Sequence, residues 1–145
     1  MGTTSHIEIS RSALGRNIRY LKKRIGHAAR FTSVIKGHAY GHGIEVFLPL
    51  AEECGVRSFA VFSADEALTA LQARTANSEI MVMGFMSSDQ VEWAVEHGVA
   101  LWVHDLRRPQ WALQAARRCG KAALLHLEVE TGLRRTGLED AELDK

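Results

Sequence analysis

Two polar, glycine-rich segments of this 145-residue chain contain residue types suited to catalysis. Residues 36–43 (KGHAYGHG) directly follow the apolar, β-branched run 31–35, and residues 128–137 (EVETGLRRTG) come at the end of the apolar run 123–129. In folds with parallel strands, ligands bind at the carboxyl ends of the strands. If both runs are strands of one parallel sheet, the two segments are candidate parts of one site.

Lys36 is the candidate reactive residue of the first segment. A lysine amine in a partly desolvated pocket has a lowered pKa and can form a Schiff base with an aldehyde. Gly37 and Gly41 allow a tight turn that would hold the phenol of Tyr40 near this amine. The alternative is that Lys36 reaches solvent at the rim of the sheet and Tyr40 packs under the next helix.

The second segment combines acidic and basic side chains. Glu128 and Glu130 alternate along an extended chain, so both are expected on the same face, where they would repel each other unless a cation lies between them. Arg135 is predicted to reach back to them and to bind a substrate carboxylate through two parallel hydrogen bonds. The alternative is a surface loop of salt bridges.

No metal site is expected. His38 and His42 are four residues apart, but the glycines around them argue against a helix, and no H-E-x-x-H pattern occurs. Cys54 and Cys119 have no metal-ligand spacing and are predicted to be reduced. A net charge of +1 gives no reason to expect nucleic acid or a membrane as partner. We predict a cytoplasmic protein without a targeting segment.

The elements that would position these residues follow a regular rhythm. Apolar, strand-like runs begin every 20 to 27 residues, and amphipathic helical patterns lie between them. Ser10 and Asp105 are candidate helix caps, and residues 63–66 and 87–90 are candidate capping boxes. The strand-like runs are residues 31–35, 58–62, 80–83, 100–103 and 123–129.

Continuous apolar runs are typical of parallel strands that are buried on both faces, so we predict an α/β fold. An open doubly wound sheet and a β/α barrel both fit, although no G-x-G-x-x-G or Walker loop follows a strand. A (β/α)8 TIM barrel has eight units, and about five βα units would form a partial barrel. Such a sheet has two open edges that need cover, and we therefore expect self-association.

The motifs resemble those of one family. Residues 34–43 (VIKGHAYGHG) resemble the pyridoxal-phosphate lysine signature of bacterial alanine racemases, V-[VI]-K-A-N-A-Y-G-H-G. Residues 126–138 (HLEVETGLRRTGL) resemble the family's H-[LI]-K-[VI]-D-T-G-M-x-R-L-G-[FV] segment. Residues 7–18 and 59–71 resemble its opening segment and its second strand and helix. The resemblance extends over nearly the whole chain.

The resemblance implies a fold-type III enzyme in which Lys36 binds pyridoxal 5'-phosphate as an aldimine and acts as one of two catalytic bases. Tyr40 would lie near the cofactor phosphate, and Arg135 near the cofactor's phenolic oxygen and the substrate carboxylate. The cofactor would act as an electron sink that makes the Cα proton acidic. The implied reaction interconverts L- and D-alanine for peptidoglycan synthesis, and the implied assembly is a homodimer.

The sequence also departs from the family pattern. Gly37 and His38 replace Ala-Asn, Glu130 replaces Asp, and Thr136 replaces Leu. Glu128 stands where many members have a lysine that is often carbamylated, so its carboxylate could supply the same supporting negative charge to Arg135.

Family enzymes have a complete barrel and a β-rich C-terminal domain, which contributes the second base from the partner subunit. We therefore expect residues 1–145 to be the N-terminal part of a pyridoxal-phosphate-binding barrel, a fragment with weak or no activity alone. Two alternatives stay open. One is a related racemase for another amino acid, and the other is a non-catalytic cofactor-binding or interaction module.

Overall fold

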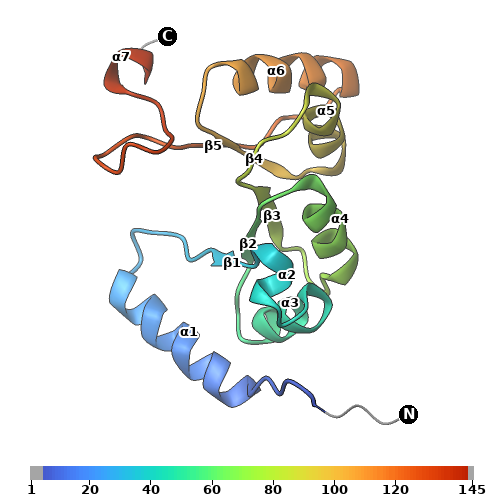
Figure 1. The fold of residues 1–145 in the computed structure, drawn as a ribbon, viewed down its shortest axis with the longest axis vertical. Helices are drawn as coiled ribbons and strands as arrows, with labels where there is room; N and C mark the ends of the chain where they lie inside the picture. Colours follow the sequence, from blue (N-terminus) through green and yellow to red (C-terminus); the bar gives the residue numbers. More distant parts are fainter. Residues whose placement is uncertain (1–4, 144–145) are drawn as a thin grey trace.

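The structure is a computed structural model that describes residues 5–143. Five short strands alternate with helices along the chain (Figure 1). The elements are α1 (Arg11–Ile25), β1 (Ser33–Val34), α2 (Lys36–Tyr40), α3 (Ile44–Glu53), β2 (Ser58–Val61), α4 (Ala64–Ala73), β3 (Glu79–Val82), α5 (Ser88–His97), β4 (Ala100–Val103), α6 (Arg107–Cys119), β5 (Leu125–Leu127) and α7 (Asp140–Leu143).

The strands form one parallel sheet in the order β1-β2-β3-β4-β5. Each strand therefore pairs with the strand before it in the chain, as in a β/α barrel, and not with the reversed order of a doubly wound sheet. This arrangement confirms the predicted α/β fold with five parallel strands that alternate with helices. In the described residues, β1 and β5 are the edges of the sheet.

Helices α3 to α6 lie along one face of the sheet (Figure 1). The main core lies between them and the sheet, and Phe59, Ile80 and Leu101 contribute to it from three neighbouring strands. The helices add small side chains such as Ala67 and Ala94, which let the helices approach the sheet closely.

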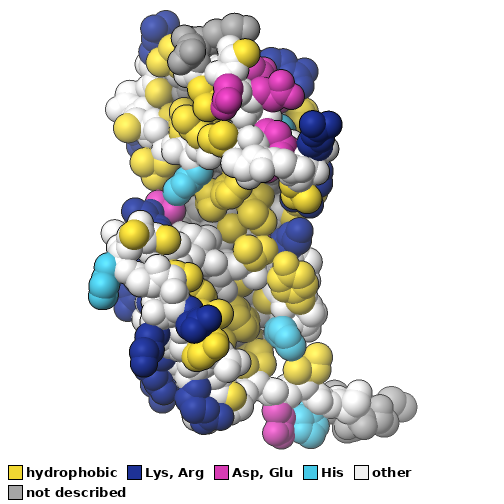
Figure 2. Space-filling model, turned by 90° about the vertical axis from the view of Figure 1, so that its left-hand side faces the viewer, with side chains coloured by type: hydrophobic (Ala, Val, Ile, Leu, Met, Phe, Trp, Pro, Cys, Tyr) yellow, Lys and Arg dark blue, Asp and Glu magenta, His cyan; other side chains and the backbone are white. Residues whose placement is uncertain are grey.

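The opposite face of the sheet has a smaller apolar cluster, and none of the helices within residues 5–143 packs on its centre. Ala60, Met81 and Ala100 form this cluster, with Met83 and Trp102 beside it. Figure 2 looks toward this side of the molecule and shows hydrophobic side chains gathered at mid-height. In a closed barrel this face would be the interior, so we name it the inner face.

The central strands fit the prediction of fully buried runs, and the edge strands do not. All four residues of β2 are buried, whereas Leu125 and Leu127 of β5 are exposed. The prediction of burial on both faces is therefore wrong for β5, because an edge strand has a neighbour on one side only and the inner face is uncovered there.

Helix caps follow the sequence signals closely. The hydroxyl of Ser10 accepts from the amide of Ala13 at the start of α1, and residues 87–90 form a complete capping box at the start of α5. Asp105 accepts from the amides of Arg107 and Arg108 at the start of α6. No helix within residues 5–143 is both long enough and apolar enough to cross a bilayer.

Candidate active site

Lys36 begins a left-handed turn at the carboxyl end of β1. Four consecutive residues after it have positive φ: Gly37 (62°), His38 (53°), Ala39 (56°) and Tyr40 (54°). The sequence predicted no helix here, and although the hydrogen-bonding pattern is helical, the φ and ψ angles are left-handed. We call residues 36–40 the lysine turn.

The lysine turn opens toward a hollow of about 440 Å³ above the strand ends. This hollow, here called the strand-end pocket, has a size typical of small-molecule sites. Every strand contributes to it, or the segment that follows the strand does. Its lining residues are Lys36, Phe62, Met83, Gly84, Phe85, Trp102, His104, Glu128, Arg135 and Thr136.

The pocket brings together three of the four predicted site residues. Lys36 comes from the β1 exit, and Glu128 and Arg135 come from the segment after β5, so the strand-end argument places them in one hollow. Tyr40 is not among the lining residues, and its side chain is 64% exposed. Tyr40 is therefore outside the pocket lining, and its phenol beside Lys36 stays a prediction.

Glu128 has two hydrogen-bond donors in the pocket. The indole Nε1 of Trp102 donates to Oε2 at 2.8 Å, and the hydroxyl of Thr136 donates to Oε1 at 2.9 Å. Among the ion pairs of the described residues, none joins Arg135 to Glu128 or Glu130. Arg135 therefore does not reach back to these carboxylates as predicted, and Glu128 accepts from uncharged donors instead.

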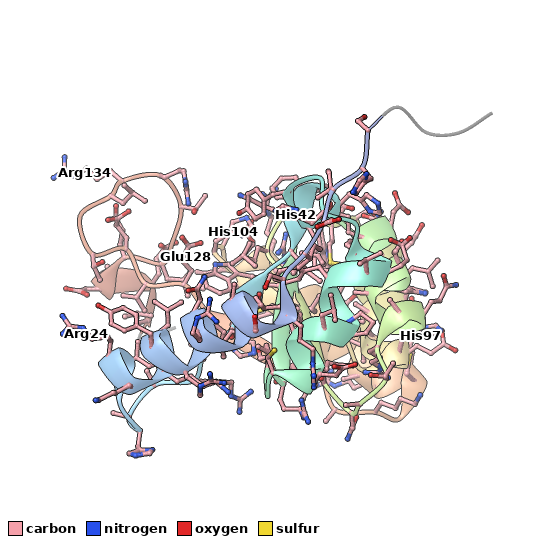
Figure 3. All side chains as sticks on the ribbon, turned by 90° about the horizontal axis from the view of Figure 1, so that it is seen from below. Arg24, His42, His97, His104, Glu128 and Arg134 are labelled. Carbon is pink, nitrogen blue, oxygen red and sulfur yellow. The ribbon has the colours of Figure 1, made fainter. Side chains whose placement is uncertain are left out.

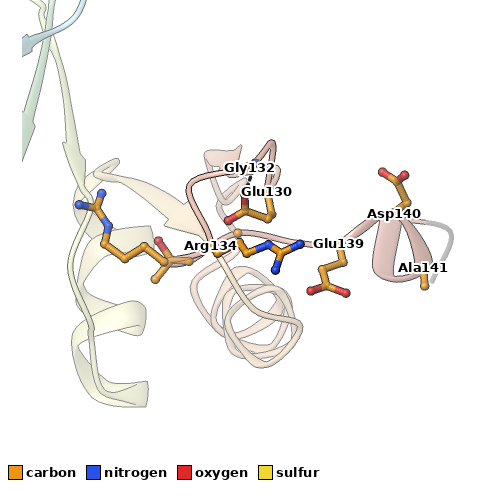
Figure 4. A pocket seen from close by; sticks show the side chains of 9 residues that line it. Glu130, Gly132, Arg134, Glu139, Asp140 and Ala141 are labelled. Atoms are coloured by element: carbon orange, nitrogen blue, oxygen red, sulfur yellow. Dashed lines mark hydrogen bonds between the residues drawn. The ribbon is translucent and has the colours of Figure 1, made fainter.

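Glu130 lies in a different hollow from Glu128. The backbone closes a loop between Val129 and Leu138, and the Glu130 carboxylate accepts from the amide of Gly132 inside that loop. Figure 4 shows this second hollow, which also borders Glu139 and Asp140. Glu128 and Glu130 therefore line different hollows, although the backbone stays paired through Glu130 and bends only at Thr131 and Gly132.

Lys36 and Arg135 are both exposed at the mouth of the strand-end pocket. The sequence predicted a pocket that partly shields the Lys36 amine from solvent. The five described strands wall the pocket from one side only, which leaves the amine in contact with solvent. Figure 3 shows Glu128 and His104 on this side of the molecule and Arg134 pointing outward from the loop.

The two histidines of the first segment have separate partners. His38 lies 3.7 Å from the carboxylate of Glu45, and the ring of His42 stacks on Phe47 with centroids 6.4 Å apart. His104, which sequence reasoning did not select, lines the pocket. It follows Val103 directly, so the strand-end rule that selected Lys36 applied to it as well.

Comparison with known proteins agrees with this geometry. Residues 9–145 match the family model "Alanine racemase, N-terminal domain". The chain belongs to this family. An alanine racemase from Symbiobacterium thermophilum is 35% identical over 138 residues, which are 95% of this chain and 36% of that protein. Alanine racemase 1 of Bacillus subtilis is 34% identical over 136 residues, 93% of this chain and 34% of that protein.

Solved structures of racemases have the same fold. The chain superimposes on alanine racemase from Oenococcus oeni with a TM-score of 0.79 and 28% identity, over 94% of this chain and 39% of that one. Histidine racemase from Leuconostoc mesenteroides gives a TM-score of 0.79 and 26% identity, over 92% and 36%. The chain therefore spans about a third of the length of these relatives.

Proposed function

We propose that this chain forms the lysine-bearing part of a pyridoxal-phosphate-dependent racemase that interconverts L- and D-alanine. One observation carries the proposal: in a chain of the alanine racemase family, Lys36, Glu128 and Arg135 line one pocket at the strand ends. To line one pocket, the segments 36–43 and 128–137, whose nearest ends are 85 residues apart in the sequence (128 − 43), must meet at the carboxyl ends of the strands.

The pocket residues fit pyridoxal phosphate at three points. The Lys36 amine is accessible for an aldehyde, Phe62 and Trp102 offer aromatic faces to a planar ring, and Arg135 offers a guanidinium to a phenolic oxygen or a carboxylate. The exposed phenol of Tyr40 is proposed as one phosphate contact. The remaining phosphate ligands are proposed to come from outside residues 1–145.

Each pocket residue has a separate role in this proposal. When bound, the cofactor supplies an electron sink that acidifies the substrate Cα–H bond. Lys36 then holds or returns a proton at Nζ on one face of the substrate, and Arg135 orients the substrate carboxylate. Glu128 fixes Trp102 and Thr136 through its two hydrogen bonds, which keeps that wall of the pocket in place. The second base is proposed to come from a partner subunit in a cytoplasmic homodimer.

A racemase for another amino acid is the second candidate, and the similarity to histidine racemase favours it. In D2O with pyridoxal phosphate, a single base suffices to exchange the Cα proton. Deuterium uptake by L-alanine that exceeds uptake by L-histidine supports the first candidate, and the reverse order supports the second.

The direct test of the proposal is chemical labelling of Lys36. We expect pyridoxal phosphate followed by borohydride to modify Lys36 selectively, as located by peptide mass, because this amine lines the strand-end pocket. The substitution Lys36→Arg keeps the charge and should abolish the labelled peptide completely.

Lys121→Arg is the matched control, since Lys121 is tied to the carbonyl of Glu96 at 2.5 Å, away from the pocket. This variant should label as the unsubstituted chain does. Scattered modification of several lysines, unchanged by Lys36→Arg, would contradict the proposal.

A further inference from the structure

Glu66 of α4 makes long-range hydrogen bonds to the lysine turn. Its Oε1 accepts from the amides of Gly37 at 2.6 Å and His38 at 3.2 Å, and its Oε2 accepts from the amide of Phe62 at 2.8 Å. Gly37 and His38 are the two residues that follow Lys36. One carboxylate in α4 thus binds the backbone at the exits of both β1 and β2.

The equivalent residue of α5 behaves differently. There the side chain of Gln90 accepts from the amide of Ser87, which completes a local capping box. In α4 the hydroxyl of Ser63 accepts from the amide of Glu66, but the Glu66 carboxylate goes to Phe62 and to the lysine turn. The predicted capping box at residues 63–66 is therefore only half formed.

Glu66 is suited to this arrangement because an ionised carboxylate has only hydrogen-bond acceptors and no donor. Partial burial alone would raise its pKa, but the hydrogen bonds from the amides of Phe62, His38 and Gly37 hold the pKa below the usual value of a glutamate. All the backbone amides that bind Glu66 are donors, so the carboxylate can accept a hydrogen bond from each of them.

The lysine turn needs support from outside itself. The left-handed region costs an L-residue roughly 1 to 2 kcal/mol, and His38, Ala39 and Tyr40 all occupy it in succession. Bonds within the turn join Gly41 to Gly37 and Gly43 to His38 through backbone atoms. These bonds close the turn but do not fix it relative to the neighbouring strands, whereas Glu66 does.

Glu66 also ties the lysine turn to the wall of the strand-end pocket. Phe62, whose amide it binds, lines the pocket, and the carbonyl of Phe62 accepts from the amide of Gly84 at 3.0 Å. Gly84 lines the pocket as well. The exits of β1, β2 and β3 are thereby joined in one chain of hydrogen bonds with Glu66 at its centre.

We propose that Glu66 is the positioning residue that holds the lysine turn, and with it the Lys36 amine, in register with the strand-end pocket. This inference rests on the proposed function, because it assigns Glu66 a role in presenting the lysine that reacts. Glu66 does not line the pocket and acts through the backbone of Gly37 and His38.

A pair of isosteric substitutions separates positioning from simple loss of charge. In Glu66→Gln, the new NH2 group must face at least one backbone N–H. Both groups are donors, and a backbone N–H cannot act as an acceptor, so that hydrogen bond is lost. In Glu52→Gln, the same charge is lost, but Oε1 of Glu52 faces only the hydroxyl of Ser78, which can rotate to accept. Glu52 lies near the chain that enters β3, at the other end of the strands.

Two measurements are made on each variant: amide hydrogen exchange at Gly37, His38 and Phe62, and the rate at which pyridoxal phosphate and borohydride label Lys36. Loss of one hydrogen bond to a charged acceptor corresponds to about a tenfold change in an equilibrium. We therefore expect Glu66→Gln to speed exchange at one or more of these amides and to slow labelling about tenfold. Glu52→Gln should leave labelling unchanged and should not speed exchange at these three amides more than at the amides of the central strands.

Unchanged amide exchange and labelling in Glu66→Gln would overturn the inference. An equally large fall in the labelling rate of Lys36 in Glu52→Gln would also overturn it. Failure of the proposed function looks different, because the unsubstituted chain itself would then show no selective label at Lys36. Amide exchange would still decide in that case whether Glu66 holds the lysine turn. If Glu66→Gln does not fold, Glu66→Asp, which keeps the charge, should retain slower but selective labelling.

Discussion

Gly84 permits a close approach of the backbone at the strand-end pocket. A Cβ atom built on Gly84 would lie 2.2 Å from the carbonyl oxygen of Phe62 and 3.0 Å from its ring. Contacts of 2.2 Å cannot be relieved by a rotamer change when the partner is backbone. The absence of a side chain at this one position is therefore required for the β2 and β3 exits to lie side by side.

The substitution Gly84→Ala should force these two exits apart. We expect a loss of roughly 1 to 3 kcal/mol in the free energy of unfolding, measured by urea titration, together with slower labelling of Lys36. Gly15→Ala is the control, because Gly15 is inside helix α1 and its Cβ would meet a flexible arginine at 3.3 Å and a cysteine sulfur at 3.4 Å. Alanine favours a helix by up to about 1 kcal/mol, so stability should not fall there. Equal losses in both variants would contradict this account.

At the scale of residues, the strand-end rule predicted that Lys36, Glu128 and Arg135 gather in one pocket. It could not predict the position of Tyr40, because three successive non-glycine residues in the left-handed region leave no mark in residue type. The role of Glu66 was also missed. Its position three residues after Ser63 is fully explained by a local capping box, whereas its bond to Gly37 joins residues 29 apart.

The N-terminus of α5 is stabilised by the hydroxyl of Ser87 and not by that of the neighbouring Ser88. The Ser87 hydroxyl accepts from the Gln90 amide, whereas the Ser88 hydroxyl contacts only the side chain of Asp89 at 3.4 Å. We expect Ser87→Ala to cost about 1 kcal/mol of unfolding free energy, because an orphan amide at a helix N-terminus loses its partner. Ser88→Ala should change stability by less than about 0.5 kcal/mol. Urea titrations that gave the reverse order would refute the assignment of Ser87 as the cap.

At the scale of elements, hydrophobic runs and caps predicted the secondary structure well. The runs 58–62, 80–83 and 100–103 match β2, β3 and β4 to within a residue or two. The run 123–129 overestimates β5, because a hydrophobic run does not reveal that pairing with β4 stops at Leu127 and that Val129 pairs with Leu138 instead. Pairing partners and edges are properties of the assembled sheet, and local sequence does not encode them directly.

The stability of the whole molecule should depend on the ionisation of Glu52. This side chain is 2% exposed, and it accepts from the side chains of Ser78 and Thr75 and from the amides of Thr75 and Ala76. Burial alone would raise its pKa, but these hydrogen bonds hold the pKa below the usual 4.5. The stabilisation is therefore fully present above pH 4.5 and is lost as the pH falls through the lower, folded-state value.

We expect the unfolding free energy of the unsubstituted chain to decline on acidification below about pH 4.5 more steeply than that of Glu52→Gln. The difference between the two chains isolates Glu52 from Glu66 and Asp105, whose pKa values are also lowered. Urea titrations at pH 7, 5, 4 and 3 measure this difference. Parallel curves over the whole range would show that Glu52 contributes nothing to the acid sensitivity.

The sheet order has a consequence for how the chain acquires its structure during synthesis. Because each strand pairs with the strand just before it, every new βα unit can add to a template that has already left the ribosome. The loops to be closed are short, with successive strand starts about 20 to 25 residues apart, and short loop closures favour fast assembly. The polypeptide can thus grow its sheet from β1 toward β5 at the pace of translation, and β5 is the growing end.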